Sequence, residues 1–293
     1  MGRLEMLAQS DVTVLIGGET GSGKGLLARQ LHALSRRSGE PYVIADCSAL
    51  TVSLFESQMF GHVKGAFTGA SSDRLGLVRA ADGGTLFLDE VGELALESQA
   101  KLLTLIEERT VLPVGSERRL NVNFRLIAAT HRDLPAMVKA GAFREDLYYR
   151  LAVVELSVAP LRERRDEVPM LIDELIERKA KLLGIEPKRA SAECYMALLD
   201  YPWPGNVREL GHAIERALVM SRGDWLELDA LPPRVVSHWR EHPHGHGRLM
   251  SEAMRRPEHI AGVLKATAGN KAEAARKLGI SRRHLYRLLN ETA

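Results

Sequence analysis

The stretch Val12-Thr-Val-Leu-Ile-Gly-Gly-Glu-Thr-Gly-Ser-Gly-Lys24 decides the fold of this chain. Its first part, Val12–Gly17, is a short run of apolar and β-branched residues, which is typical of a buried strand in a parallel sheet. Leu27, Leu31 and Leu34 follow at helical spacing, so the glycines lie between a strand and a helix. In that place they let several backbone N–H groups point at one phosphate, and the helix start adds partial positive charge. We therefore predict a nucleotide-phosphate loop over Gly18, Glu19, Thr20, Gly21, Ser22, Gly23 and Lys24.

The residue after the lysine departs from the general motif. Lys24 is placed to neutralise the β and γ phosphates of the nucleotide. A Ser or Thr normally follows and holds Mg²⁺ with its hydroxyl, whereas this chain has Gly25. We count Gly25 in the nucleotide site, but we expect the metal to depend on water and on a carboxylate elsewhere.

A second apolar run, Thr85-Leu-Phe-Leu-Asp89-Glu90, ends in two acids. In a parallel sheet such a strand presents its last residues at the edge where the phosphate loop lies. We predict that Asp89 binds Mg²⁺, directly or through water, and that Glu90 orients and polarises the attacking water. A lone Asp-Glu pair often ends an exposed strand, but its combination with a phosphate loop favours an ATPase.

Strand and helix patterns alternate up to about residue 160. Further strand patterns occur at 42–45, 124–129 and 153–156, with helical patterns such as Ser98–Glu108 between them. This alternation predicts an α/β fold whose parallel sheet is covered on both faces. Beyond that point the patterns are helical, at 166–183, 191–199 and 206–221, which predicts a smaller helical domain.

The predicted domains are an α/β core (1–160), a helical domain (161–231), a linker (232–256) and a C-terminal helical domain (257–293). The linker begins with Pro232-Pro233 and contains a His-rich run at 242–247. Because that run has no carboxylate or Cys at fixed spacing, we favour a flexible segment over a metal site.

Composition excludes some classes of protein. Hydrophobic residues make up 45% and charged residues 27% of the chain, which is ordinary for a soluble globular protein. No apolar run approaches the ~20 residues of a membrane span, and the N-terminus has no secretory signal. With only Cys47 and Cys194 present, a reduced cytoplasmic setting is the simplest expectation.

Charge is distributed unevenly along the chain. Residues 251–293 carry nine Lys or Arg and four Asp or Glu, a net charge of +5 in a chain whose total is +2. This segment therefore favours a polyanion as its partner, although a solvated basic surface would give the same balance.

The same segment has the pattern of three helices. Gly279 separates the second and third helices, as the turn of a helix-turn-helix requires, and Ser281 can cap the third. Arginines at the start of the third helix can reach guanine edges in the major groove of DNA. The alternative is a plain three-helix cap with a basic surface. The predicted DNA-binding residues are Asn270, Lys271, Ser281, Arg282, Arg283, His284, Tyr286 and Arg287.

One motif remains, the hexapeptide Gly65-Ala-Phe-Thr-Gly-Ala70. Its two glycines bracket Phe67-Thr68 and predict a tight exposed turn that holds an aromatic side chain toward solvent. The hexapeptide resembles the signature loop of the sigma-54-dependent transcription activators, a branch of the AAA+ ATPases. Other blocks agree with this family over nearly the whole chain: 60–62, 83–90, 143–151, 160–164 and 203–210. The C-terminal pattern resembles the Fis-type helix-turn-helix that ends many of these activators.

The resemblance implies roles for several residues. It implies that the loop residues Gly65, Ala66, Phe67, Thr68, Gly69 and Ala70 contact sigma-54. Thr130 and His131 match a phosphate sensor, and Arg208 matches a second sensor on a helical AAA+ lid. Arg144 and Arg150 match arginine fingers that reach the ATP of a neighbouring subunit, which implies a ring, usually a hexamer. Outside this motif context, each arginine would be interpreted as part of a surface ion pair.

Two departures from the family bear on activity. The family usually has Asn where this chain has Asp46, and that Asn holds the catalytic Glu and couples hydrolysis to the signature loop. An Asp near Glu90 would put two carboxylates together, which tends to raise the pKa of one of them. The resemblance also implies a further segment before the first strand that helps to hold the adenine, where this chain has only Met1–Asp11.

The sequence thus predicts an ATP- and Mg²⁺-dependent transcription activator. It would bind upstream double-stranded DNA and remodel sigma-54 RNA polymerase from the closed to the open promoter complex. The first alternative is a DNA-binding regulator with impaired ATPase activity, which Gly25 and Asp46 favour. The second is an AAA+ remodeller of another protein, such as a clamp loader or an unfoldase, against which the intact hexapeptide counts.

Overall fold

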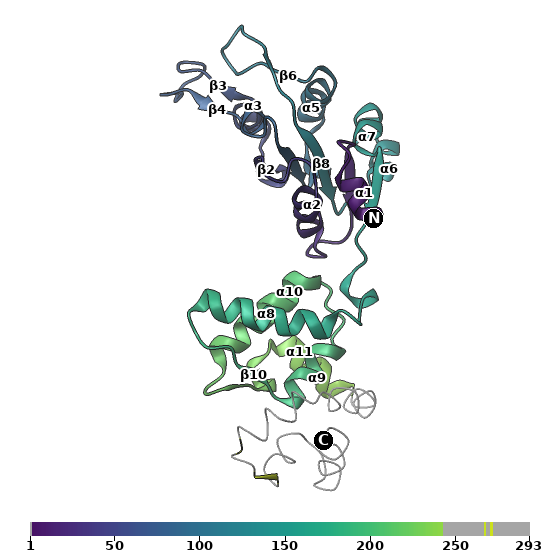
Figure 1. Ribbon diagram of the computed structural model, residues 1–293, viewed down its shortest axis with the longest axis vertical. Helices are drawn as coiled ribbons and strands as arrows, with labels where there is room; N and C mark the ends of the chain where they lie inside the picture. The colour runs from purple at the N-terminus through teal and green to yellow at the C-terminus, as the bar shows by residue number, and fades with distance from the viewer. Residues whose placement is uncertain (1, 243–266, 268–269, 272–293) are drawn as a thin grey trace. The chain divides into compact units, whose positions relative to one another are not determined.

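A five-stranded sheet in the order β2-β5-β8-β1-β9, with all neighbours parallel, forms the centre of the N-terminal part of the chain (Figure 1). The strands are β1 (Val14–Gly17), β2 (Tyr42–Asp46), β5 (Thr85–Asp89), β8 (Arg125–Thr130) and β9 (Val154–Ser157). The predicted parallel α/β sheet is confirmed, and each strand overlaps the run of residues that predicted it.

The computed structural model describes residues 2–242, 267, 270 and 271. The chain divides into two compact units, Met1–Ala159 and Pro160–Ala293. The helices of the first unit are α1 (Arg3–Ala8), α2 (Lys24–Ala33), α3 (Val52–Phe60), α4 (Leu77–Ala80), α5 (Leu96–Glu108), α6 (Leu134–Lys139) and α7 (Glu145–Leu151).

Alternate residues of the strands feed two hydrophobic clusters, one on each face of the sheet. Val14 and Ile16 of β1 pack with α1 and α2 on one face. Leu15, between them, belongs to the cluster that α3, α4, α5 and α7 complete on the other face. The central strands β1, β5 and β8 are therefore buried on both sides and largely apolar, whereas the edge strands β2 and β9 keep exposed residues.

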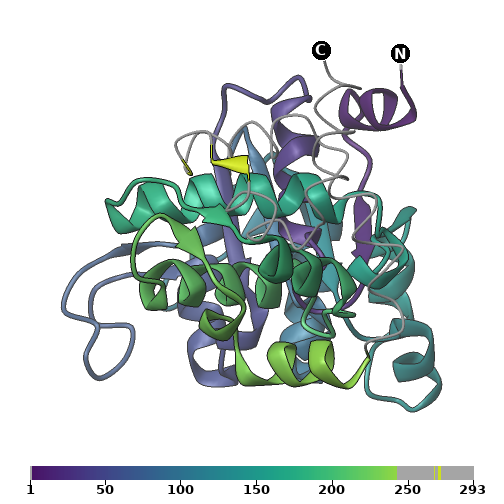
Figure 2. The ribbon, with the colours of Figure 1, turned by 90° about the horizontal axis from the view of Figure 1, so that it is seen from below.

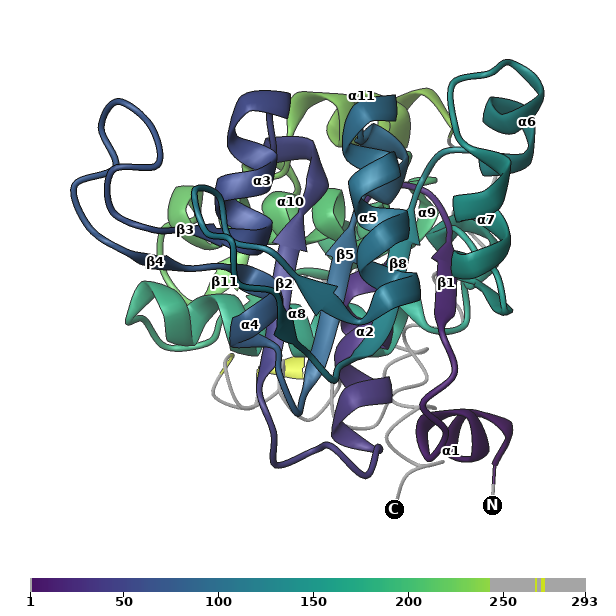
Figure 3. The same ribbon diagram turned by 90° about the horizontal axis from the view of Figure 1, so that it is seen from above.

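Two small antiparallel pairs extend from this unit. One consists of β3 (Gly61–His62) and β4 (Arg74–Leu75), and the other of β6 (Thr110–Val111) and β7 (Leu120–Asn121). The loop between β3 and β4 contains the hexapeptide, and it extends away from the sheet (Figure 3). Neither pair was predicted, because two-residue strands leave no periodic pattern in the sequence.

The second unit is a bundle of helices around its own core (Figure 2). Its helices are α8 (Val168–Leu183), α9 (Ala192–Asp200), α10 (Asn206–Met220) and α11 (Pro233–Glu241). The predicted helical domain is confirmed. It also contains a two-residue parallel pair, β10 (Arg189–Ala190) with β11 (Trp225–Leu226), which no sequence pattern indicated.

The linker prediction is wrong for Pro233–Glu241. This segment forms α11, with Val235, Val236 and Trp239 buried in the core of the second unit. Arg234 also forms an ion pair with buried Glu209 of α10, at 2.9 Å. The two prolines occupy the start of the helix, where a missing N–H costs nothing, whereas the prediction took them as signs of a linker.

Both cysteines are buried free thiols, as predicted. Burial raises the pKa of Cys194 to about 12 and raises that of Cys47 further, so both thiols are protonated at neutral pH. Within the part of the chain that the structure describes, no helix has the length and apolar character needed to cross a bilayer.

Helix α1 is fixed to the sheet by a buried arginine. Arg125 of β8 is 0% exposed, and its guanidinium donates to the carbonyl oxygens of Ala8 (2.6 Å) and Leu7 (3.0 Å). Both carbonyls lie in the last turn of α1, where the helix itself supplies no further i+4 donor, and that of Leu7 also accepts from Ser10 N (3.2 Å) and Ser10 Oγ (2.8 Å). Burial lowers the pKa of Arg125, and the carboxylate of Asp11 opposes that shift.

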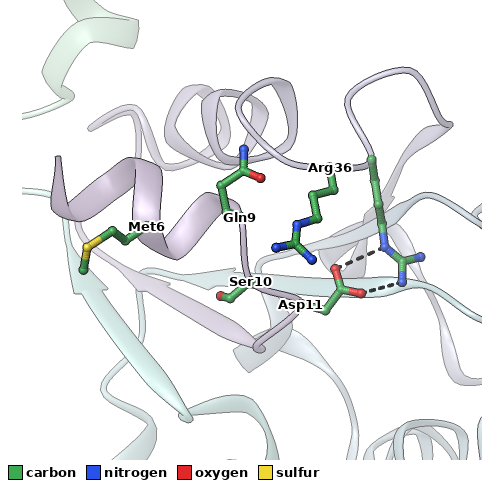
Figure 4. Close-up of a pocket in the computed structure, with 6 residues that line it drawn as sticks. Met6, Gln9, Ser10, Asp11 and Arg36 are labelled. Carbon is green, nitrogen blue, oxygen red and sulfur yellow. Dashed lines mark hydrogen bonds and ion pairs between the residues drawn. The ribbon is translucent and has the colours of Figure 1, made fainter. Parts of the chain in front are cut away.

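An open pocket of about 490 Å³ lies between the end of α1 and the end of α2. Figure 4 shows Asp11 paired with an arginine there, with Arg36 between Gln9 and this pair. The arginine is Arg37, whose NH2 lies 2.7 Å from Asp11 Oδ2. Because α2 begins at the phosphate loop and runs back along the sheet, this pocket lies at the end of α2 remote from that loop.

Replacing Arg125 by methionine should destabilise the first unit by about 1–3 kcal/mol, because the buried carbonyl of Ala8 loses its donor. Chemical denaturation measures the loss, and hydrogen exchange should show the amides of α1 opening first. Arg36→Met, at an exposed position beside the same pocket, should change the free energy of unfolding by no more than about 0.5 kcal/mol. Equal stability of Arg125→Met and the wild-type chain would show that α1 does not depend on this cap.

Candidate functional site

Three predicted motifs meet at the carboxyl edge of the sheet. The phosphate loop follows β1, Glu90 follows β5, and His131 follows β8. Strand β8 lies between the other two, with Gly17 in register with Thr130 and Leu88 in register with Ala128. Parallel strands end at one edge, so segments far apart in the sequence form one site.

The phosphate loop has a backbone that glycine alone adopts easily. Gly18, Gly21 and Gly23 have φ values of 150°, 77° and 110°. A Cβ atom on Gly18 would lie 2.7 Å from the carbonyl oxygen of Val158, so a side chain there is also excluded by space. Gly23 precedes the first residue of α2, where unpaired N–H groups and the helix dipole favour an anion. The loop therefore fits a phosphate group.

Lys24 is buried, with 5% of its side chain exposed, and is folded back into the loop. Its Nζ donates to the carbonyl oxygens of Gly18 (2.9 Å) and Glu19 (3.3 Å) and forms an ion pair with Glu90 Oε1 at 3.2 Å. The ammonium therefore occupies the centre of the predicted nucleotide site.

Gly25 has room for a larger side chain. It is exposed in the first turn of α2, and an added Cβ would meet only the ring of Phe87, at 3.9 Å. The structure therefore has room for Ser or Thr at position 25, and no steric restriction requires glycine there.

Asp89 and Asp46 end neighbouring strands and lie opposite each other in register. Burial raises the pKa of Asp89, and the negative charges of Glu90 and Asp46 add to that shift. Asp46 accepts hydrogen bonds from Ser48 N (3.0 Å) and Ser48 Oγ (2.6 Å), and so caps a short 3-10 helix, Cys47–Ala49. The predicted crowding of carboxylates is present, but the raised pKa is that of Asp89 and not that of Glu90.

Glu90 is held by His131. Glu90 Oε2 accepts a hydrogen bond from the backbone N of His131 at 3.0 Å and lies 2.7 Å from His131 Nδ1. Burial alone would raise the pKa of Glu90, but the bonds from His131 and the charge of Lys24 lower it below its ordinary value. The carboxylate is therefore ionised and fixed in direction, as activation of water requires. No pattern in the sequence indicates this contact.

A second carboxylate faces the other nitrogen of the same imidazole. His131 Nε2 lies 3.8 Å from Glu93 Oε1, and Arg132 forms an ion pair with Glu93 at 2.5 Å. The hydroxyl of buried Thr130 accepts a hydrogen bond from Arg132 N at 3.0 Å. Glu93 and Arg132 belong to no motif that the sequence singled out.

Asp89 is the candidate metal ligand. In the described residues, no group of three His, Cys, Asp or Glu side chains is arranged to hold a metal by itself. Nucleotide-bound Mg²⁺ does not need such a group, because phosphate oxygens and water complete its shell around one or two carboxylates. Asp89, at the end of β5 and beside the phosphate loop, fits that requirement.

The hexapeptide forms the tight turn that its glycines predict. Gly65 N donates to the carbonyl oxygen of Ala70 at 2.9 Å, and Gly65 and Gly69 have φ values of 84° and 104°. Phe67 is 45% exposed, and its ring meets that of His62 edge-on at 4.9 Å. The aromatic side chain is thus presented at the surface and supported from one side.

The β6–β7 hairpin supports the base of this loop. Val63 N donates to Val114 O at 3.1 Å, and Val114 N donates to Gly61 O at 2.9 Å. A Cβ on Gly115 would lie 2.7 Å from the Cβ of Ala66. The two loops therefore touch closely enough to move together.

The predicted arginine fingers lie on the surface of the first unit. Arg144 pairs with Asp146 at 2.7 Å, and Arg150 of α7 pairs with Glu107 at 3.1 Å. Both pairs are solvent-exposed, and such pairs are weak because water and salt screen them. Either arginine could therefore exchange its partner at small cost.

The remaining predicted residues are placed only in part. Arg208 is exposed on α10 of the second unit. Asn270 and Lys271 are exposed, and Asn270 N donates to Thr267 O at 2.8 Å. The helix-turn-helix prediction and its residues Ser281, Arg282, Arg283, His284, Tyr286 and Arg287 lie outside the described residues.

Comparison with known families agrees with these motifs. Residues 1–157 match the sigma-54 interaction domain, residues 162–247 match the AAA+ ATPase lid domain, and residues 258–291 match the Fis family of bacterial regulatory proteins. The chain belongs to the sigma-54 interaction domain family. The resemblance carried by Gly65–Ala70 and the other blocks is thereby confirmed, as are the lid and the C-terminal helix-turn-helix as domains of this family member.

Curated relatives of this family member are longer than the chain. It is 46% identical over 291 residues to the transcriptional regulatory protein ZraR of Klebsiella oxytoca. The alignment covers 99% of this chain and 66% of that protein. It is 43% identical over 297 residues to the regulatory protein AtoC of Escherichia coli (strain K12), which covers 97% of this chain and 63% of that protein.

Solved structures show the same fold for this family. NtrX from Brucella abortus in complex with ADP aligns with a TM-score of 0.74 at 30% identity, over 98% of this chain and 66% of that one. NtrX in complex with ATP aligns with a TM-score of 0.72 at 31% identity, over 98% of this chain and 65% of that one.

The raised pKa of Asp89 predicts that its charge destabilises the metal-free fold. Asp89→Asn should raise the melting temperature in Mg²⁺-free buffer at neutral pH, because the variant has no half-buried charge to ionise. The folded chain holds the Asp89 proton more tightly than the unfolded chain, so this advantage should shrink as pH falls through the raised pKa and vanish below the ordinary one. Calorimetric scans across this range test the prediction, with Asp229→Asn, at an 81% exposed side chain, as control. A lower melting temperature for Asp89→Asn at neutral pH would contradict it.

Proposed function

We propose that this chain is the ATP-hydrolysing part of a transcription activator, which binds upstream DNA and remodels sigma-54 RNA polymerase from the closed to the open promoter complex. The observation that carries the proposal is the meeting of Lys24, Asp89 and Glu90 at one edge of the sheet, in a chain whose hexapeptide loop presents Phe67. The NtrX structures with ADP and with ATP, at about 30% identity, support a nucleotide at this edge.

The residues of the site divide the chemistry of hydrolysis between them. The N–H groups from Gly18 to Gly25 bind phosphate oxygens, and Lys24 donates to the β and γ phosphates. Asp89 would hold Mg²⁺, which supplies positive charge to those oxygens when it is bound. Glu90 accepts a proton from water as the water attacks the γ phosphorus, and the bond to the β-phosphate oxygen breaks to give ADP and phosphate.

Full activity would require a second subunit. Arg144 and Arg150 leave Asp146 and Glu107 and reach the nucleotide of a neighbouring copy, where a guanidinium stabilises charge on the transferred phosphoryl group. A site completed in this way implies a ring, for which we propose six subunits. Arg208 reports the nucleotide to the lid. The absence of a hydroxyl at Gly25 means that Mg²⁺ is held more weakly than in a chain with Ser or Thr there.

The partners follow from two other parts of the chain. The exposed ring of Phe67, together with Thr68, would contact sigma-54, and the β6–β7 hairpin would move the loop with the state of the nucleotide. Residues 258–291 would bind double-stranded DNA as a Fis-type helix-turn-helix, with the basic residues between Asn270 and Arg287 on bases and phosphates.

Steady-state phosphate release from ATP and Mg²⁺, measured over a range of protein concentrations, tests the enzyme. Turnover should rise cooperatively with concentration, because fingers act between subunits, and Glu90→Ala should abolish it. Removal of Mg²⁺ should have the same effect as the variant. Turnover no greater than that of Glu90→Ala at every concentration would leave a DNA-binding regulator without ATPase activity.

Phe67→Ala separates the sigma-54 role from hydrolysis. The variant should lose binding to sigma-54 by at least roughly tenfold, as expected when a central aromatic anchor is truncated, while ATP turnover persists. Pull-down with purified sigma-54 in the presence of ATP measures the loss, and Phe60→Leu at a partly buried position in the neighbouring helix is the control. Undiminished binding of Phe67→Ala would favour remodelling of another protein.

A further inference from the structure

The carboxylate of Glu90 lies within a row of alternating basic and acidic side chains. Lys24 is at one end, followed by Glu90, His131, Glu93 and Arg132, and each side chain faces the next at 3.2, 2.7, 3.8 and 2.5 Å. His131 contributes twice, through its backbone N and through Nδ1. Two bonds from one residue fix both the position and the direction of the carboxylate.

We propose that His131 is the positioning residue for Glu90, the role that the family resemblance assigns to position 46, and that Glu93 orients the imidazole. This inference rests on the proposed ATPase function. It makes His131 a residue that acts through Glu90, in addition to its place in the predicted phosphate sensor.

The carboxylates of Asp46 and Asp89 explain why Glu90 contacts His131 and not the side chain at position 46. Asp46 is exposed, and its carboxylate accepts hydrogen bonds from Ser48 N and Ser48 Oγ. Asp89 lies in register beside it, so a third carboxylate directed toward these two would be repelled. Glu90, which has a left-handed backbone with φ of 54°, instead points to the cationic and N–H donors of Lys24 and His131.

Glu93 gives the imidazole a fixed orientation. Its carboxylate is paired with Arg132 and faces His131 Nε2, while Nδ1 faces Glu90. A histidine placed between two anchored carboxylates has few other rotamers that keep Nδ1 in hydrogen-bond contact with Glu90 and Nε2 directed toward Glu93. Loss of Glu93 should therefore loosen Glu90 without removing any group that contacts it.

The arrangement also couples phosphate to Glu90. Thr130 and His131 are consecutive, so a shift of the Thr130 peptide caused by the γ phosphate moves the N–H that holds Glu90. Phosphate oxygens also compete with Glu90 for Lys24. Binding of ATP would thus release Glu90 from Lys24 while His131 keeps it directed, and loss of phosphate would restore the ion pair.

A comparison of kcat with ATP affinity tests the positioning role. His131→Leu should lower kcat by at least roughly tenfold with the Kd for ATP changed by less than about threefold. His131→Asn, whose amide nitrogen lies near the place of Nδ1, should recover most of the loss. Asp46→Ala should reduce kcat less than His131→Leu does, and His212→Leu, at an exposed histidine of α10, should behave as wild type. A greater loss for Asp46→Ala than for His131→Leu would overturn the proposal.

A second measurement does not depend on activity. In protein with isotope-labelled histidine, the imidazole nitrogen signals of His131 can be identified by their loss in His131→Asn. Glu90→Gln and Glu93→Gln should each shift them, whereas Asp46→Ala should shift them less. Signals that do not respond to Glu90→Gln would overturn the positioning role even in a chain that hydrolyses ATP. Responsive signals in a chain without turnover would instead contradict the ATPase proposal and leave the contact between the two residues established.

Discussion

The pairing of β8 with β1 on one side and β5 on the other is the constraint on which the rest of the site depends. Parallel pairing forces the three strands to end at one edge, and each is followed by a segment that carries chemistry. No single segment binds or activates anything alone. The loop after β1 offers N–H donors, β5 supplies Asp89 and Glu90, and β8 supplies the residues that direct Glu90.

Charge balance at this edge is set by burial as much as by residue type. Asp89 and Glu90 are neighbours in sequence, yet the pKa of Asp89 is raised and that of Glu90 is lowered. Burial penalises the charge of both. The hydrogen bonds from His131 and the charge of Lys24 outweigh that penalty at Glu90, whereas at Asp89 the negative charges of Glu90 and Asp46 add to it and outweigh the effects of Lys24 and of the Glu90 N–H. A cation bound at Asp89 would remove this imbalance, which is a physical reason for a metal to bind where the apo fold is least satisfied.

Away from the carboxyl edge of the sheet, the side chains predicted to contact partners are exposed at the surface. Phe67 is supported by His62 and by the β6–β7 hairpin, and Arg144 and Arg150 are in weak surface ion pairs. Each of these groups could change partners without disturbing a buried core. The stable parts of the first unit, such as the Arg125 cap of α1, lie at the other end of the sheet.

The sequence by itself determined the features that arise within a few residues of one another. The phosphate loop, the turn of Gly65–Ala70 and the five strands of the sheet follow from glycine geometry and apolar runs, which act locally. Only the tertiary structure decided that His131 holds Glu90, 41 residues away in the chain. It likewise decided that Asp46 caps the 3-10 helix Cys47–Ala49 and that Arg125 binds the last carbonyls of α1. It also decided that Pro233–Glu241 is a helix of the second unit, because Val235, Val236 and Trp239 gain a core to pack against. Contacts of this kind depend on strand order and on the competition among all buried groups, which no local pattern records.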